Sequence, residues 1–146
     1  MGIMDWLRAA LAGSARAEAA MPLMLAKGRG FTFEIVGESH YQNAIAKVAG
    51  PKSSAGCKVE TTAQLVFNDG NAHDLNAIGV LLDGRVAGFV PRDQAAAMRA
   101  AILRINPDER PVICRAKIVG GWLSDDGDEG AYGVKLSLAQ PLKTQT

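Results

Sequence analysis

Apolar and polar residues alternate with a period of two in four stretches of the chain. The first covers residues 31–36, where Phe31, Phe33 and Ile35 recur at every second position, and the longest covers residues 57–67. Residues 112–119 and 132–138 supply the other two. A two-residue repeat points successive side chains to opposite faces of a strand. We therefore predict four strands, the longest with one buried face and one wet face.

Two further apolar stretches, residues 76–82 and 85–90, flank the dipeptide Asp83-Gly84. Both residue types tolerate the positive φ that a two-residue hairpin turn requires. The sequence therefore predicts a β-hairpin here. The polar residues 68–75 before it and the Gly-rich, acidic residues 120–130 between the last two strands are expected to be loops.

A helical period replaces the strand period in two places within this region. Residues 41–49 put Ile45 and Val48 on one face and stop at Gly50-Pro51, which cannot continue a helix. A second helix should open at Asp93 and end before Pro107. Its apolar stripe consists of Met98, Ala101, Ile102 and Ile105.

The N-terminal segment has a different character. Residues 3–20 are rich in Ala, Leu, Arg and Glu, and Trp6, Leu7, Ala10 and Leu11 fall at helical spacing. We predict an amphipathic helix that ends or kinks at Pro22. Residues 27–30, Lys-Gly-Arg-Gly, are expected to form a flexible basic hinge.

These elements predict a mainly β protein with short helices, of the α+β class. A small antiparallel sheet of about six strands with two helices most economically closes into an OB-like barrel. The expected organisation is an N-terminal helix and hinge at residues 1–30, a barrel domain at residues 31–140 and a C-terminal tail at residues 141–146.

Composition narrows the function classes. The 146 residues include 48% hydrophobic and 21% charged residues and carry a formal net charge of +1, so a nucleic-acid contact would need a local patch. No apolar run is long enough for a bilayer, and we expect a cytoplasmic protein without a membrane partner. Cys57 and Cys114 lie in alternating segments and are expected to be buried, reduced thiols.

Three blocks of the chain together resemble the HIRAN domain family. These blocks are Val36-Gly37-Glu38-Ser39-His40-Tyr41, then Asn71 to Val80 with Asp83 to Arg92 (NAHDLNAIGV and DGRVAGFVPR), and Ala116 to Trp122 with Tyr132-Gly133-Val134. The resemblance spans roughly residues 31 to 138. It implies a modified OB-like barrel that recognises single-stranded DNA, in the best-understood members at a free 3′ end.

The resemblance also implies a binding site. The family's base-stacking positions fall on His40 and His73, beside Tyr41, and its end-recognising acid falls on Asp74. The basic residue that opens the second helix falls on Arg92, and the loop amides on Asn71 and Asn76. Ser39 stands where the family has a basic residue, and His73 where it has Tyr. The expected site is therefore His40, Tyr41, Asn71, His73, Asp74, Asn76 and Arg92.

Family members join this module to a DNA-translocating ATPase and sometimes to a zinc-binding RING finger. The sequence has neither a Gly-x-x-x-x-Gly-Lys-Ser/Thr loop nor a Cys/His zinc array. We therefore expect a single-stranded nucleic-acid-binding module, with DNA favoured as partner, without a cofactor, a bound metal or catalytic activity of its own.

Two other functions compete with this one. His40, His73 and Asp74 would form a two-His-one-carboxylate set able to hold a divalent metal for phosphodiester hydrolysis. Adjacent side chains such as His73 and Asp74 point apart on a regular strand, so they could share a metal only on an irregular loop. Alternatively, the helix at residues 3–20 pairs with a partner protein or a second copy, and the barrel is a scaffold.

Overall fold

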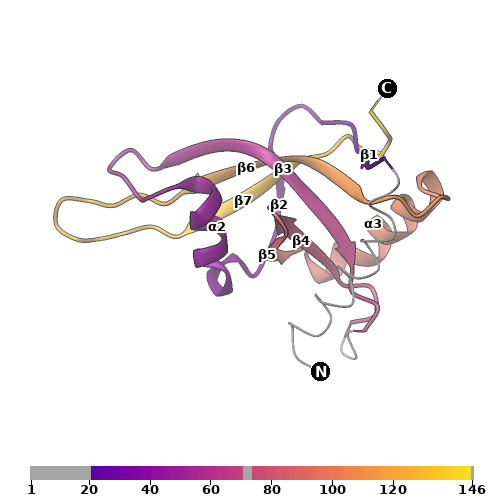
Figure 1. Cartoon of the computed structure of the whole chain (residues 1–146), viewed down its shortest axis with the longest axis horizontal. Coiled ribbons are helices and arrows are strands. Elements are labelled where there is room, and N and C mark those ends of the chain that lie inside the picture. Colours follow the sequence, from indigo (N-terminus) through magenta and orange to yellow (C-terminus); the bar gives the residue numbers. More distant parts are fainter. Residues whose placement is uncertain (1–20, 71–73, 146) are drawn as a thin grey trace.

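The computed structural model describes residues 21–70 and 74–145 (Figure 1). Its strands form one sheet in the order β2-β7-β6-β3-β4-β5, and β1 pairs with β6 outside this path. The sheet curls into an antiparallel half-barrel, so the predicted mainly β fold with two helices is confirmed. The elements are β1 (Leu23–Met24), β2 (Phe33–Glu34), the 3-10 turn η1 (Glu38–His40), α2 (Gln42–Ala49), β3 (Cys57–Phe67), β4 (Ile78–Leu82), β5 (Arg85–Phe89), α3 (Arg92–Ile105), β6 (Val112–Gly120) and β7 (Tyr132–Ser137).

The long strands follow the predicted two-residue repeat. In β3 the side chains of Ala63 and Leu65 are buried, whereas Lys58, Glu60 and Thr62 on the other face are exposed. β6 shows the same alternation along its length. The predicted hairpin is confirmed, and its turn residues Asp83 and Gly84 have φ values of 50° and 77°. A turn with two positive φ values matches the right-handed twist of the strands on either side.

The first strand is shorter than predicted because the chain changes partner within it. Phe33 and Glu34 pair with β7, but Val36 pairs with Phe89 of β5 on the other side. Two backbone hydrogen bonds of 2.8 Å join Val36 and Phe89, one in each direction. Since β2 and β5 are the two ends of the strand path, this bridge joins the ends of the curled sheet.

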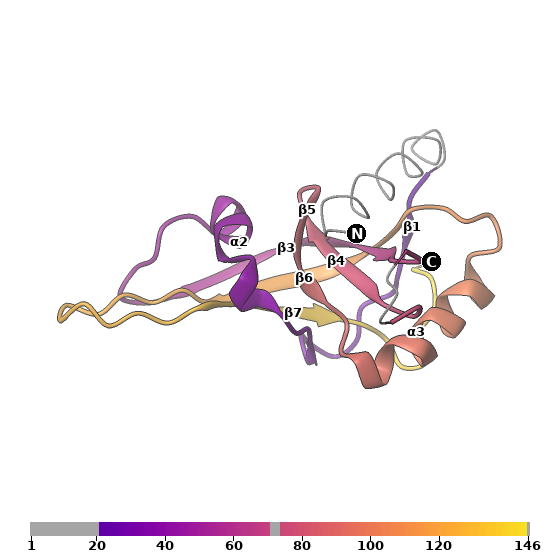
Figure 2. The ribbon, with the colours of Figure 1, turned by 90° about the horizontal axis from the view of Figure 1, so that it is seen from below.

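The core fills the concave side of the sheet. Helix α3 contributes Ala95, Met98 and Ile102, and α2 contributes Ile45. These side chains pack with buried residues from every strand except β2, which adds the half-buried Phe33. The two helices lie at different positions along the long axis of the molecule, and the β6–β7 hairpin extends beyond α2 (Figures 1 and 2).

Residues 21–30 lie against the sheet. Leu23 and Leu25 are buried, and β1 runs parallel to β6 with Leu23 opposite Val112. The Gly28 N–H donates to Ser137 Oγ at 3.0 Å. No pattern in the sequence predicts β1, because two residues are too few to show a period. At the other end of the chain, Thr144 forms an antiparallel bridge with Leu25.

The predicted helix at residues 3–20 lies outside the described residues. Within residues 21–70 and 74–145, no helix is long and apolar enough to cross a membrane.

Both cysteines are unpaired. Cys114 is buried as expected, whereas Cys57 is only half-buried.

Candidate nucleic-acid interface

Two of the expected site residues lie on the η1 turn and directly after it. Gly37, with a φ of 84°, reverses the chain after Val36 and starts this turn. His40 ends η1 and is exposed, and Tyr41 follows it half-buried. A residue with a Cβ adopts this φ only with strain, so glycine suits the position. The turn thereby places η1 and Tyr41 next to strand β5.

Two side chains hold η1 and α2 against β7. The Gln42 side chain accepts from the Tyr132 N–H at 2.8 Å and donates to the Tyr132 carbonyl at 3.0 Å. Glu38 Oε2 accepts from the Val134 N–H at 3.3 Å. The backbone groups that they satisfy belong to a part of β7 that does not pair with β2, which reaches only Lys135 and Leu136. The side chains therefore replace a missing strand partner and fix the position of His40 and Tyr41.

Three rings follow one another along this edge. The centroids of His40 and Tyr41 lie 6.4 Å apart at an interplanar angle of 76°, and those of Tyr41 and Phe89 lie 6.1 Å apart at 59°. We call His40, Tyr41 and Phe89 the ring row. Burial raises the pKa of the Tyr41 hydroxyl, which stays neutral at physiological pH. Edge-to-face and tilted contacts of this kind stabilise aromatic clusters.

Asp74 and Asn76 shape the loop before β4. The Asn76 N–H donates to Asp74 Oδ1 at 3.0 Å, and the Ala77 N–H donates to the Asp74 carbonyl at 3.2 Å. This is an Asx-turn, the local structural role that acidic loop residues commonly have. Asn71 and His73, the other expected site residues of this loop, lie outside the described residues.

Arg92 is the first residue of α3 and is exposed. Gly79 pairs with Phe89, and the Val90 N–H donates to the Ile78 carbonyl at 3.0 Å. This antiparallel register brings Asn76 and Arg92 to the same end of the β4–β5 ladder. The structure thus forms two groups: the ring row, and the loop end with Asp74, Asn76 and Arg92. Phe89 lies three residues before Arg92 and connects the groups along the chain.

The described residues do not form a set of metal ligands. Among residues 21–70 and 74–145, no three His, Cys, Asp or Glu side chains are grouped so that they could hold a metal ion. The metal hypothesis required His73, which lies outside these ranges, and so it stays a prediction.

The convex face of the sheet carries both cations and acids, and two of its cations form ion pairs. Lys117 and Lys135 lie opposite each other on β6 and β7, with Glu60 beyond the first and Glu34 beyond the second. Arg115 approaches Glu60 to 3.8 Å, and Lys135 approaches Glu34 to 3.9 Å. Glu60 and Glu34 lie on either side of the two lysines, so this face does not form the continuous basic patch that a phosphate backbone attracts.

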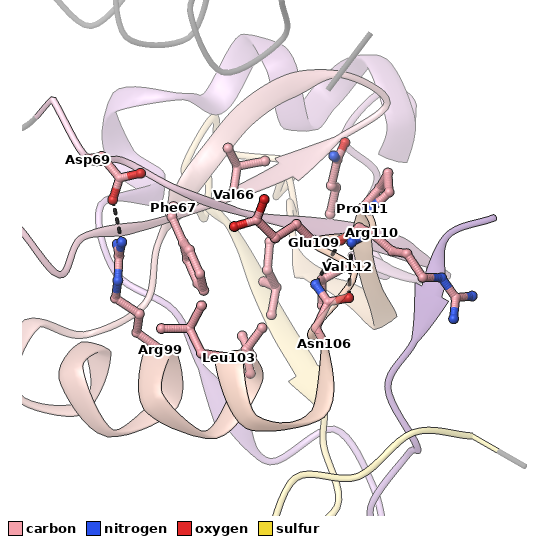
Figure 3. A pocket seen from close by; sticks show the side chains of 13 residues that line it. Val66, Phe67, Asp69, Arg99, Leu103, Asn106, Glu109, Arg110, Pro111 and Val112 are labelled. Carbon is pink, nitrogen blue, oxygen red and sulfur yellow. Dashed lines mark hydrogen bonds and ion pairs between the residues drawn. The ribbon is translucent and has the colours of Figure 1, made fainter. Parts of the chain in front are cut away.

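Two features of the structure are not predicted by the sequence. Phe89 was assigned to a strand, and only the fold brings its ring to Tyr41. The second feature is a groove of about 340 Å³ beside α3 (Figure 3). At one end of it Arg99 pairs with Asp69 and lies over the Phe67 ring at 4.3 Å. Arg99 lies off the apolar stripe of its helix, and nothing in its sequence context indicates either contact.

A comparison with known proteins finds no family model, no curated protein and no solved structure that matches the chain, so the geometry described above is what bears on function.

Proposed function

We propose that the protein is a HIRAN-type, OB-like module that binds single-stranded nucleic acid, DNA in preference, and has no catalytic activity of its own. The observation that carries the proposal is the ring row of His40, Tyr41 and Phe89 on the edge of β5, with exposed His40 at its end. Every base has a π-face, so a row of rings held in place accepts unstacked bases with little sequence preference.

Preorganisation supports this role. Gln42 and Glu38 fix η1 on β7, and the Val36–Phe89 bridge fixes β5 beside it. Rings that are already positioned lose little conformational freedom when a base stacks on them. One stacked base contributes about 1–3 kcal/mol. Val36 is 47% exposed next to Phe89 and extends the apolar surface.

Phosphate attraction has a smaller part in the proposal. Arg92 stands at the N-terminus of α3, where backbone N–H groups and the helix dipole favour an anion. On the convex face, Arg115 pairs with Glu60 and Lys135 pairs with Glu34. We therefore expect binding to depend only weakly on salt, with a slope of about −0.7 for each phosphate contacted on a single strand.

The preference for a 3′ end would come from Asp74. Its Oδ1 already accepts from the Asn76 N–H, which orients the carboxylate. A carboxylate oriented in this way can accept a hydrogen bond from a terminal hydroxyl, and the charge shortens and strengthens that bond. A 3′-phosphate would instead place a second negative charge against Asp74.

The test is fluorescence anisotropy with a labelled single strand that has a free 3′-hydroxyl. The same strand with a 3′-phosphate, the duplex and the RNA copy are measured in parallel, each at several salt concentrations. We expect the free single DNA strand to bind best. His40→Ala should weaken binding about five-fold or more, since one stacking contact of about 1 kcal/mol is lost.

Matched arginine variants separate the site from general charge. Arg92→Ala should weaken binding and flatten the salt slope by about 0.7, whereas Arg115→Ala on the convex face should leave both unchanged. Asp74→Ala should reduce the preference for the 3′-hydroxyl. Equal effects of the two arginine variants, or no binding by any strand, would refute this interface. Cleavage of the strand in the presence of Mg²⁺ or Mn²⁺ would instead favour the metal-dependent hydrolase.

A further inference from the structure

The groove beside α3 has an apolar wall that is open to solvent. Phe67 of β3 and Leu103 of α3 face each other across it in Figure 3, and Leu103 is 50% exposed. Its two ends carry charge, with the Arg99–Asp69 pair at one end and Arg110 at the other (Figure 3). A leucine this exposed on a groove wall makes the groove a candidate docking surface.

The described chain begins at the Arg110 end of this groove. Arg110 Nε donates to the Met21 carbonyl at 2.6 Å, and its Nη2 donates to the Pro22 carbonyl at 2.8 Å. The Leu23 N–H donates to the carbonyl of Pro111, which also lines the groove. Met21 is therefore held at the Arg110 end of the groove, and the segment before it is tethered at this point of the chain.

The preceding residues carry a matching apolar stripe. Ile3, Trp6, Leu7, Ala10 and Leu11 recur with the spacing of one helix face. A helix over residues 3–20 would be about 27 Å long, at 1.5 Å per residue. Because the segment is tethered at Met21, its effective concentration at the groove is on the order of millimolar.

We propose that residues 3–20 of the same chain dock in this groove as an amphipathic helix, with Trp6, Leu7 and Leu11 packed against Phe67 and Leu103. The C-terminal end of the helix lies at Arg110, and its N-terminal end points toward Arg99. Its last carbonyls then lie at Arg110, and a cation at this end of a helix is favourable. The tether and the charge at Arg110 favour this occupant over an untethered partner.

The experiment reads the environment of Trp6 in the full-length chain. The chain has two tryptophans, so Trp122→Phe leaves Trp6 as the single tryptophan, and excitation at the red edge of the absorption band avoids the two tyrosines. In this background we expect Trp6 to be shielded from acrylamide. Adding Leu103→Asp should raise its quenching constant two-fold or more and shift its emission to the red, because a charged wall no longer accepts the apolar stripe.

Leu123→Asp is the matched control, since Leu123 is 41% exposed, bridges Glu129 in the connection between β6 and β7, and does not line the groove. It should leave the quenching of Trp6 unchanged. Leu103 and Leu123 are both exposed, so both variants are expected to fold, as circular dichroism would verify. Trp6 quenched as fast as free tryptophan amide before the Leu103 change would overturn the proposal. Shielding that appears only in a dimer would overturn it in favour of a second copy.

Discussion

Replacing Gly88 by alanine should break the junction that closes the curled sheet. A Cβ at this position would lie 2.6 Å from the Val36 carbonyl oxygen and 2.8 Å from Ile35 Cδ1. The first of these atoms belongs to the backbone and accepts the Phe89 N–H. It cannot rotate away as the end of a side chain can, so β5 and the Val36 segment must separate.

The cost follows from these distances. Carbon–oxygen contacts are ordinarily about 3.3–3.6 Å, which requires a separation of roughly 0.7–1 Å. The two Val36–Phe89 hydrogen bonds, both 2.8 Å long, would then reach the limit at which a hydrogen bond is lost. Each contributes about 0.5–1.5 kcal/mol, and crowding of Ile35 adds about 1–3 kcal/mol. We expect Gly88→Ala to lower the free energy of unfolding by about 2–6 kcal/mol.

Urea denaturation followed by circular dichroism measures this change. Gly30→Ala is the control, because a Cβ there would meet no heavy atom within 4 Å. That variant should be neutral or stabilise the protein by up to about 1 kcal/mol, since it restricts the unfolded chain. Native-state hydrogen exchange should also show faster exchange of the Val36 and Phe89 amides in Gly88→Ala. If Gly88→Ala unfolds within about 0.5 kcal/mol of the parent, the close approach does not constrain the fold as we argue.

Two more predictions concern the core and the β7 edge. Burial raises the pKa of the Cys114 thiol from 9.0 to about 12. Between these pH values the thiol ionises in the unfolded chain and stays neutral in the folded one. The free energy of unfolding is therefore unaffected by Cys114 below pH 9 and falls by about 4 kcal/mol in total between pH 9 and 12. Cys114→Ala should remove that pH dependence, and reaction of the Cys114 thiol with a disulfide reagent before unfolding would contradict the burial. Gln42→Ala should cost about 2 kcal/mol, because the Tyr132 N–H and carbonyl each lose a partner. Thermal unfolding tests this variant, and an unchanged midpoint would show that water replaces the amide.

The sequence predicted those parts of the fold that depend on a local period. Residues 57–67 show a two-residue repeat of eleven residues, and the strand occupies the same range. The hairpin at Asp83-Gly84 depends on two adjacent residues and was equally clear. The parallel strand at Leu23–Met24 and the bridge at Val36 each use one or two residues whose partners lie far along the chain. Such pairs leave no periodic signal.

The candidate site shows the same limit. His40 and Tyr41 were selected as neighbours in sequence, and the structure keeps them together. Phe89 completes the ring row only because Gly37 turns η1 toward β5, a contact that depends on tertiary packing. Arg99 of α3 likewise donates to the Leu75 carbonyl at 3.4 Å, although the two residues are 24 positions apart in the chain.

The parallel pairing of β1 with β6 sets an order of events during synthesis. Pro22 is held by Arg110, which is translated 88 residues later. At about 5–20 residues per second, β1 waits roughly 4–18 seconds on the ribosome before its partner exists. During this interval Leu23 and Leu25, both buried in the finished protein, are exposed. Leu23 and Leu25 are therefore residues that a chaperone would protect first, because they are made before the rest of the sheet.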